Sequence, residues 1–143
     1  MARNTRVRKT LFVGIAVVAV AVAATALAET AGALTVTEIA TARVMVNGVP
    51  EAPVTTFTTS DRIYCFMRVE NRTGAETAVL VSFERAEGEA APGTGGMRLS
   101  IPASPRYRTF ARTGGNRPAG QYRCVVRSEA GDVLETSDFE VTN

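Results

Sequence analysis

Two cysteines, Cys65 and Cys124, are the only ones in this 143-residue chain, and they constrain its fold more than any other feature. Each lies in a run where apolar and polar residues alternate, which is typical of a half-buried β-strand. The residues on the same faces as the cysteines are apolar: Ile63, Met67 and Val69 in one run, Tyr122 and Val126 in the other. Both cysteines are therefore expected on buried strand faces, where one bridge can join two sheets across a core.

The N-terminal residues have the layout of an export signal. Residues 1–10 are basic, residues 11–28 carry no charge, and positions 26–28 read Ala-Leu-Ala, a small-x-small cleavage motif. We predict cleavage after Ala28, which leaves residues 29–143 as one domain in the periplasm or outside the cell. The alternative is an uncleaved anchor helix facing the periplasm, since residues 11–28 just reach spanning length. In such an oxidising compartment two cysteines usually form a structural disulfide.

Removal of this segment changes the charge balance of the chain. The whole chain has 16 basic and 14 acidic residues. Four of the bases and none of the acids lie in residues 1–28, so the remaining 115 residues (143 − 28) carry 12 bases against 14 acids. This balance is unlike that of a nucleic-acid-binding domain, and we expect no nucleic-acid partner.

Short strands separated by glycine, proline and polar turns account for the rest of the chain. No stretch keeps a helical period, and period-2 runs recur along the sequence. The expected strands cover residues 34–38, 42–46, 54–58, 63–69, 77–85, 97–101, 106–112 and 121–127, with a last strand ending at 141. Seven to nine strands at this spacing predict an all-β, antiparallel two-sheet sandwich.

The segment AGQYRC at 119–124 resembles the F strand of immunoglobulin-like domains. Its tyrosine, Tyr122, stands two residues before the cysteine, where these domains have their tyrosine corner. The resemblance implies that Cys65 is the B-strand cysteine. The chain has no tryptophan, so Phe83 or Val81 would fill the position of the tryptophan that these domains carry on strand C.

The last 40 or so residues also resemble a bacterial domain-of-unknown-function family, number 2914. The resemblance is carried by RYRTF at 106–110, GQYR at 120–123 and a closing hairpin at 129–141. It implies an exported or membrane-tethered bacterial β-domain. It implies no activity, so no catalytic residue is transferred.

The side chains that most enzymes use are missing from this chain. There is no histidine, which removes Ser-His-Asp and Cys-His catalysis and most zinc sites. Both cysteines are assigned to the disulfide, and no phosphate-binding glycine motif occurs. We interpret Glu84, Glu87 and Glu89 as part of a solvated loop rather than a calcium site. We therefore expect no enzyme activity, no cofactor and no metal.

One charged feature is unusual: residues 98–127 contain seven arginines and no acid. Strand alternation puts Arg106, Arg108, Phe110 and Arg112 on one face of the expected strand. An arginine ladder with an aromatic residue could bind an anionic glycan, a lipid head group or an acidic protein.

Two other interpretations of the arginines remain open. They could form a solvated outer face that is neutralised by acids of neighbouring strands, such as Glu135, Asp138 and Glu140. At a sheet edge, their charge could also discourage edge-to-edge aggregation.

Together these features predict an exported, non-catalytic β-sandwich that serves as a binding or interaction module of the bacterial envelope. Its partner would be an unknown protein or an anionic envelope ligand, with membrane contact only if residues 11–28 are not cleaved. The alternatives are a membrane-anchored structural envelope protein and a hydrolase built on a pair of carboxylates.

Overall fold

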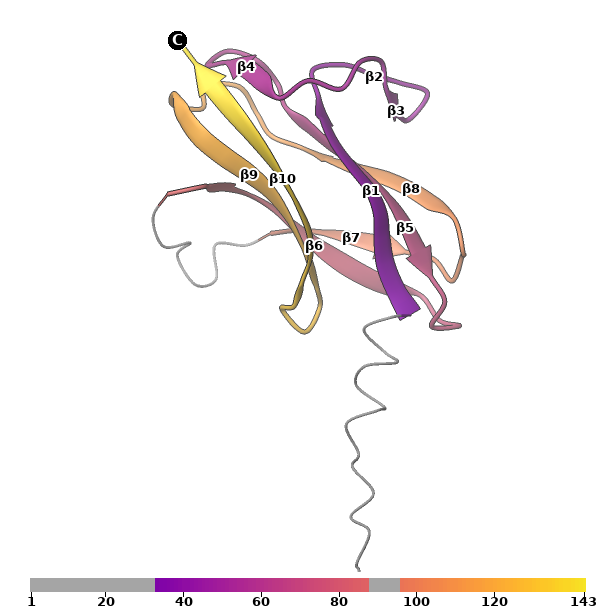
Figure 1. Cartoon of the computed structure of the whole chain (residues 1–143). Coiled ribbons are helices and arrows are strands. Elements are labelled where there is room, and N and C mark those ends of the chain that lie inside the picture. The colour runs from indigo at the N-terminus through magenta and orange to yellow at the C-terminus, as the bar shows by residue number, and fades with distance from the viewer. Residues whose placement is uncertain (1–32, 88–95) are drawn as a thin grey trace, which may run out of the picture.

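The computed structural model describes residues 33–87 and 96–143, and all ten elements in these residues are strands (Figure 1). The all-β prediction is confirmed. The predicted signal segment, residues 1–28, lies outside the described residues, as does Glu89. The strands are β1 (Leu34–Ala42), β2 (Met45–Val46), β3 (Val49–Pro50), β4 (Thr56–Thr58), β5 (Tyr64–Asn71), β6 (Thr77–Arg85), β7 (Met97–Ile101), β8 (Tyr107–Arg112), β9 (Gly120–Ser128) and β10 (Val133–Thr142).

The strands form two larger sheets and one short hairpin. The three-stranded sheet has the order β1-β5-β8, the five-stranded sheet has the order β4-β10-β9-β6-β7, and β2 pairs with β3. All pairings are antiparallel except that of β4, which runs parallel to β10, so the prediction of a wholly antiparallel arrangement is wrong at this strand. The chain therefore crosses from one sheet to the other between β1 and β4.

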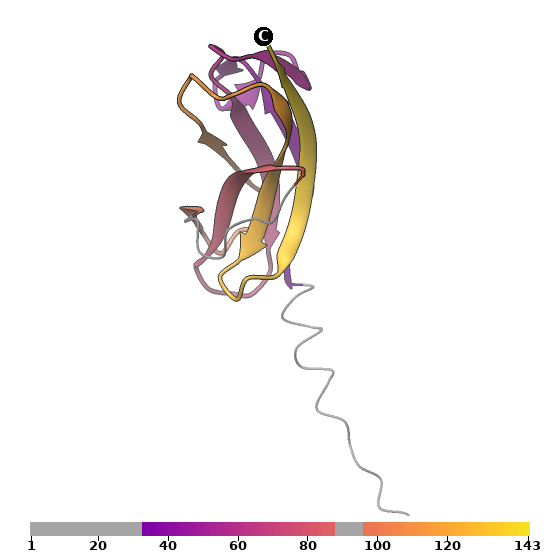
Figure 2. The same ribbon diagram turned by 90° about the vertical axis from the view of Figure 1, so that its left-hand side faces the viewer.

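The two larger sheets curl toward each other at their margins. β1 lies beside β10 at one side, and β7 lies beside β8 at the other, although neither pair is hydrogen-bonded as a ladder. Figure 2 shows the domain in profile, with the long β10 (yellow) bowed along one side. Within residues 33–87 and 96–143, no helical segment has the length and hydrophobicity that a membrane span requires.

The disulfide joins the two sheets. Cys65 on β5 is bonded to Cys124 on β9, with the two Cα atoms 6.5 Å apart, and both side chains are fully buried. The predicted inward faces of both strands are confirmed, because all of their apolar residues are buried: Ile63, Met67, Val69, Tyr122 and Val126. The main core cluster around the disulfide draws on both sheets. A structural disulfide is typical of an oxidising, extracytoplasmic compartment.

A second core cluster is aromatic. The Tyr122 hydroxyl donates a 2.7 Å hydrogen bond to the Pro118 carbonyl, which is the bond expected of a tyrosine corner. The Tyr122 ring stacks on Phe139, and Phe57 meets Phe139 edge-on, both with ring centroids 5.6 Å apart. Phe83 is opposite Cys124 in the β6–β9 register and packs against both core clusters.

The structure differs from the sequence prediction at β1. Two separate strands were expected at 34–38 and 42–46, whereas β1 runs without a break from Leu34 to Ala42. A bulge between Val36 and Glu38 shifts the register against β5, so alternate residues change face at this point. The sequence alternation is interrupted there for the same reason. The strand expected at 54–58 is shorter, since β4 begins only at Thr56.

Candidate functional site

β8 is an edge strand of the three-stranded sheet, and it alternates as predicted. Its outward side carries the four exposed candidate residues, Arg106 (one residue before the strand), Arg108, Phe110 and Arg112. The residues between them are buried or half-buried: Tyr107, Thr109 and Ala111. The local pattern of the sequence was therefore sufficient to place these four side chains on one surface.

The start of β8 is held in place by a buried polar side chain, Asn71, at the end of β5. Its Nδ2 donates hydrogen bonds to the carbonyls of Ala75 (2.8 Å) and Pro102 (3.0 Å). Its backbone N–H donates to the Ser104 carbonyl (2.9 Å). The Ser104 hydroxyl in turn donates to the Arg106 carbonyl at 2.9 Å. This network ties the β7–β8 connection to β5 and so positions Arg106.

Pairing with β5 sets what lies beside each candidate residue. Along the register, Arg108 is opposite Arg68, Phe110 is opposite Phe66, and Arg112 is opposite Tyr64. The outer face of the three-stranded sheet is thus a surface of arginines and aromatic rings contributed by two strands.

The aromatic rings of this face are in contact with neighbouring side chains of β5 and β8. Phe66 is fully buried although it lies on the outward side, and the guanidinium of Arg68 lies 5.8 Å from its ring centroid. Phe110 stays 38% exposed and meets the Tyr64 ring edge-on, with centroids 5.7 Å apart. Guanidinium groups over aromatic faces are favourable cation–π contacts.

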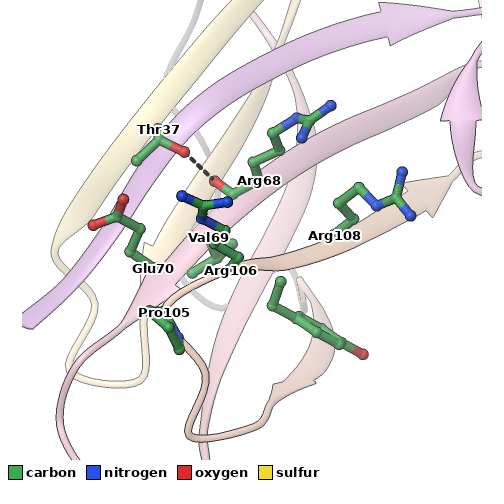
Figure 3. Close-up of a pocket in the computed structure, with 8 residues that line it drawn as sticks. Thr37, Arg68, Val69, Glu70, Pro105, Arg106 and Arg108 are labelled. Atoms are coloured by element: carbon green, nitrogen blue, oxygen red, sulfur yellow. Dashed lines mark hydrogen bonds between the residues drawn. The ribbon is translucent and has the colours of Figure 1, made fainter.

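A groove of about 650 Å³ opens on this face where β8 begins. Its polar lining comes from three segments: Thr37 of β1, Arg68 and Glu70 of β5, and Arg106 and Arg108 at the start of β8. Figure 3 shows Arg68, Arg106 and Arg108 projecting to the same side of the ribbon. The Thr37 hydroxyl donates to the Arg68 carbonyl at 3.4 Å.

The charges on this face are unevenly compensated. Nε of Arg68 is 2.6 Å from Oε2 of Glu38, and Nη2 of Arg72 is 3.2 Å from Oε2 of Glu70. Within the described residues, none of the three candidate arginines of the β8 segment forms an ion pair. In this part of the chain, no carboxylate within 4 Å balances these positive charges.

The acids proposed to neutralise the arginines lie elsewhere. Glu135, Asp138 and Glu140 belong to β10, in the five-stranded sheet, so they do not flank β8. Asp138 faces Arg123 instead, with Oδ1 and Nε 3.6 Å apart. The expectation that these acids pair with the arginines of the 106–112 strand is wrong, because strand order could not be read from the sequence.

Tyr64 lies opposite Arg112 and follows Arg62 in the chain. Hydrogen bonding to Arg62, and to a smaller extent to Arg112, holds the pKa of the Tyr64 hydroxyl below its ordinary value of 10.0, although partial burial opposes this shift. Of these two arginines only Arg112 belongs to the candidate face, and its contribution is the smaller one.

Arg117 has a different environment from the other arginines of the 98–127 segment. Its guanidinium lies 5.1 Å from the ring centroid of Tyr122 and 5.6 Å from that of Phe83. Partial burial lowers the pKa of Arg117, an effect opposed by Tyr122 and reinforced by Arg85. We interpret Arg117 as a packing residue over the aromatic cluster.

The groove residues on other strands were missed by the sequence prediction. The alternation of the 63–69 run does place Arg68 opposite its buried neighbours. Nothing in the sequence shows that β5 lies next to β8, and the contributions of Thr37 and Glu70 depend on that topology.

Chemically, this arrangement suits anion recognition. Planar guanidinium groups bind carboxylate, phosphate or sulfate through paired N–H donors. In residues 33–87 and 96–143, no group of three or more histidine, cysteine, aspartate or glutamate side chains is placed to hold a metal ion.

No protein-family model matches the chain, and no curated protein sequence matches it. Among solved structures, it is similar to an alkylpurine DNA glycosylase of Pseudomonas fluorescens, bound to DNA with an abasic site analogue, at 12% identity and a TM-score of 0.51. That alignment covers 82% of this chain and 33% of the glycosylase, so the chain spans about a third of that protein's length. At this identity the likeness concerns the fold alone.

Two further structures align less well. An immunoglobulin-like protein from Pseudomonas aeruginosa matches at 9% identity and a TM-score of 0.49, over 76% of this chain and 96% of that one. A β-glucosidase from Kluyveromyces marxianus matches at 14% identity and a TM-score of 0.44, over 74% of this chain and 14% of the glucosidase.

Proposed function

We propose that this chain is an exported, non-catalytic binding module with an immunoglobulin-like fold, and that its ligand is anionic. The observation that carries the proposal is the outward face of β8. There Arg106, Arg108 and Arg112 lie exposed, without an ion pair in the described part of the chain, beside the half-exposed ring of Phe110.

The immunoglobulin-like assignment is supported by topology. The two cysteine-bearing strands, β5 and β9, belong to opposite sheets, as strands B and F do. β6 follows β5 and pairs with β9, as strand C pairs with F, and β10 completes the hairpin in the place of strand G. The Tyr122–Pro118 hydrogen bond matches the tyrosine corner. The disulfide supports export, because cytosolic thiols are kept reduced.

A binding role accounts for the groove better than a catalytic one. The chain has no histidine, and the groove's one carboxylate, Glu70, is engaged by Arg72. A hydrolase would need a nucleophile with an adjacent base, or two cooperating carboxylates. The resemblance of the last 40 residues to bacterial family 2914 stays a prediction and agrees with an envelope location.

The test is retention of the full chain on an immobilised polyanion. We expect the wild-type protein to bind heparin–agarose, a sulfated polysaccharide, and to elute with increasing salt, because exposed charges are screened. The Arg106→Ala/Arg108→Ala variant should elute at clearly lower salt.

The matched control removes two arginines from the other sheet. Arg98→Ala/Arg123→Ala has the same loss of charge but leaves β8 intact, and it should elute close to the wild type. Equal losses in both variants would mean that net charge, rather than the β8 face, causes retention. Duplex DNA is the second probe, and binding to DNA that depends on Arg106 and Arg108 would contradict the expectation of no nucleic-acid partner.

A further inference from the structure

The open edge of β8 presents backbone groups as well as charge. In the described residues β8 pairs only with β5. The Thr113 N–H donates to the Ile63 carbonyl at 2.9 Å, which fixes the phase of the antiparallel ladder. Hydrogen-bonded pairs recur at every second residue from there. The N–H and C=O groups of Arg108, Phe110 and Arg112 therefore point away from β5, toward the open edge.

The same three residues carry the outward side chains. A strand added at this edge would place the partners of Arg108, Phe110 and Arg112 on the same outer face, about 5 Å away. Acidic partners opposite the two arginines and an apolar partner opposite Phe110 would satisfy both the charge and the ring. Backbone bonds would give affinity, and alternate side chains would give specificity.

The charge of the edge also selects against other occupants. A second copy of β8 added in antiparallel register would bring arginine against arginine, which is destabilising. β7 passes beside β8 without pairing with it. The edge is thus protected from self-association, as expected for a positively charged edge strand, and stays open to an acidic strand.

We propose that β8 binds an extended acidic peptide segment of a partner protein as an additional strand of the three-stranded sheet. The segment carries acids at alternate positions, with an apolar residue between two of them, in the pattern acid-x-apolar-x-acid. This inference rests on the proposed function, since it assigns a ligand class and a binding mode to the same arginine face.

The test measures binding of a labelled peptide to the full chain by fluorescence anisotropy. The probe is Thr-Glu-Thr-Glu-Thr-Val-Thr-Glu-Thr, acetylated and amidated at its ends. Its control has the same composition with the three glutamates consecutive. We expect the alternating peptide to bind at least tenfold more tightly, and Arg108→Ala/Arg112→Ala to abolish that difference.

Hydrogen exchange gives the structural readout. Strand addition should slow exchange at the amides of Arg108, Phe110 and Arg112 when the peptide is bound.

Phe110→Pro removes one of these N–H groups at a position where proline is tolerated, because this N–H faces the open edge. It should weaken binding at least fivefold relative to Phe110→Val. A peptide N-methylated at the amides that face β8 tests the same bonds without altering the protein.

The two proposals fail in distinguishable ways. If heparin binding depends on Arg106 and Arg108 but the alternating peptide binds no better than its control, strand addition is overturned and the anion-binding function stands. Strand addition is also overturned, and anion binding stands, if the protein binds heparin or anionic vesicles but no ligand slows exchange at the three amides. If neither heparin nor the peptide binds, both proposals are wrong.

Discussion

The outward faces of the two larger sheets both carry arginines, but the two faces differ in whether a carboxylate lies beside each arginine. On the five-stranded sheet, each of three arginines has a carboxylate within 4 Å: Arg98 with Glu129, Arg123 with Asp138, and Arg127 with Glu84. In the β8 segment (residues 106–112), the three candidate arginines have no such partner among the described residues. All six belong to the same acid-free stretch of sequence.

The difference is caused by the neighbouring strands. β9 lies between β10 and β6, whose residues Asp138 and Glu84 are both opposite Arg123 in register. In the described residues β8 pairs only with β5, which places Arg68 opposite Arg108 and Tyr64 opposite Arg112. In this domain, the charge balance of the strand arginines thus depends on which strands lie beside them rather than on the sequence around each residue.

The largest expected effect on stability comes from removal of the Cys65–Cys124 disulfide, which joins the two sheets. Cys65→Ala/Cys124→Ala should lower the free energy of unfolding by about 2–5 kcal/mol, since it frees a loop of 59 positions. Urea denaturation followed by circular dichroism measures it. Reduction of the wild-type protein should reproduce the shift, and an unchanged midpoint would show that the two sheets hold together without the bridge.

Removal of one arginine from each face should have unequal effects on stability. Arg127→Ala leaves Glu84, whose side chain is only 13% exposed, without its cation, and should cost about 1–3 kcal/mol. Arg108→Ala removes no ion pair and should stay within about 0.5 kcal/mol of the wild type. If the two variants lose equal stability in urea, the distinction between compensated and uncompensated faces is not energetic.

Two tyrosines, one on each of the larger sheets, should differ in the same direction by a smaller amount. Tyr122→Phe removes the hydrogen bond to Pro118 but keeps the ring stacked on Phe139, and should cost about 1 kcal/mol. Tyr64→Phe, on the exposed arginine face, should cost less than about 0.5 kcal/mol. The thermal unfolding midpoint of each variant checks this order, and a reversed order would contradict it.

The smallest effect concerns a compensated arginine beside the three-stranded sheet, Arg43. Hydrogen bonds from the Thr58 N–H (2.8 Å) and from Arg43 (3.0 Å) hold the pKa of Asp61 below its ordinary value of 3.8. A depressed carboxyl pKa contributes stability that is present above pH 3.8 and is lost as the pH falls through the folded-state pKa.

Asp61→Asn should therefore flatten the fall in stability below about pH 4 and change little of the slope above it. Urea midpoints between pH 7 and pH 2.5 measure this dependence. An identical slope in variant and wild type would show that Asp61 does not titrate differently on folding.

The local features of the fold could be predicted because they depend on a period of two. The buried faces around Cys65 and Cys124 and the exposed face from Arg106 to Arg112 are read directly from alternation. Where alternation is interrupted, as at the bulge after Val36, the sequence predicted two strands instead of one.

Features that depend on pairing could not be predicted. The groove needs Arg68 to lie opposite Arg108, and the burial of Phe66 on an outward face needs packing from neighbouring elements. The parallel pairing of β4 with β10 joins residues more than 80 positions apart. No pattern in the sequence around these residues indicates any of these contacts.

The position of the disulfide has a mechanical consequence. A pulling force on the two ends of the domain would pass from β5 directly to β9 through the Cys65–Cys124 bond, bypassing β6, β7 and β8. Stretching could then release only the residues outside this covalent loop. At roughly 3.5 Å per residue, the loop withholds about 200 Å of extension. β8 lies within this shielded segment, so tension along the chain would not pull on it directly.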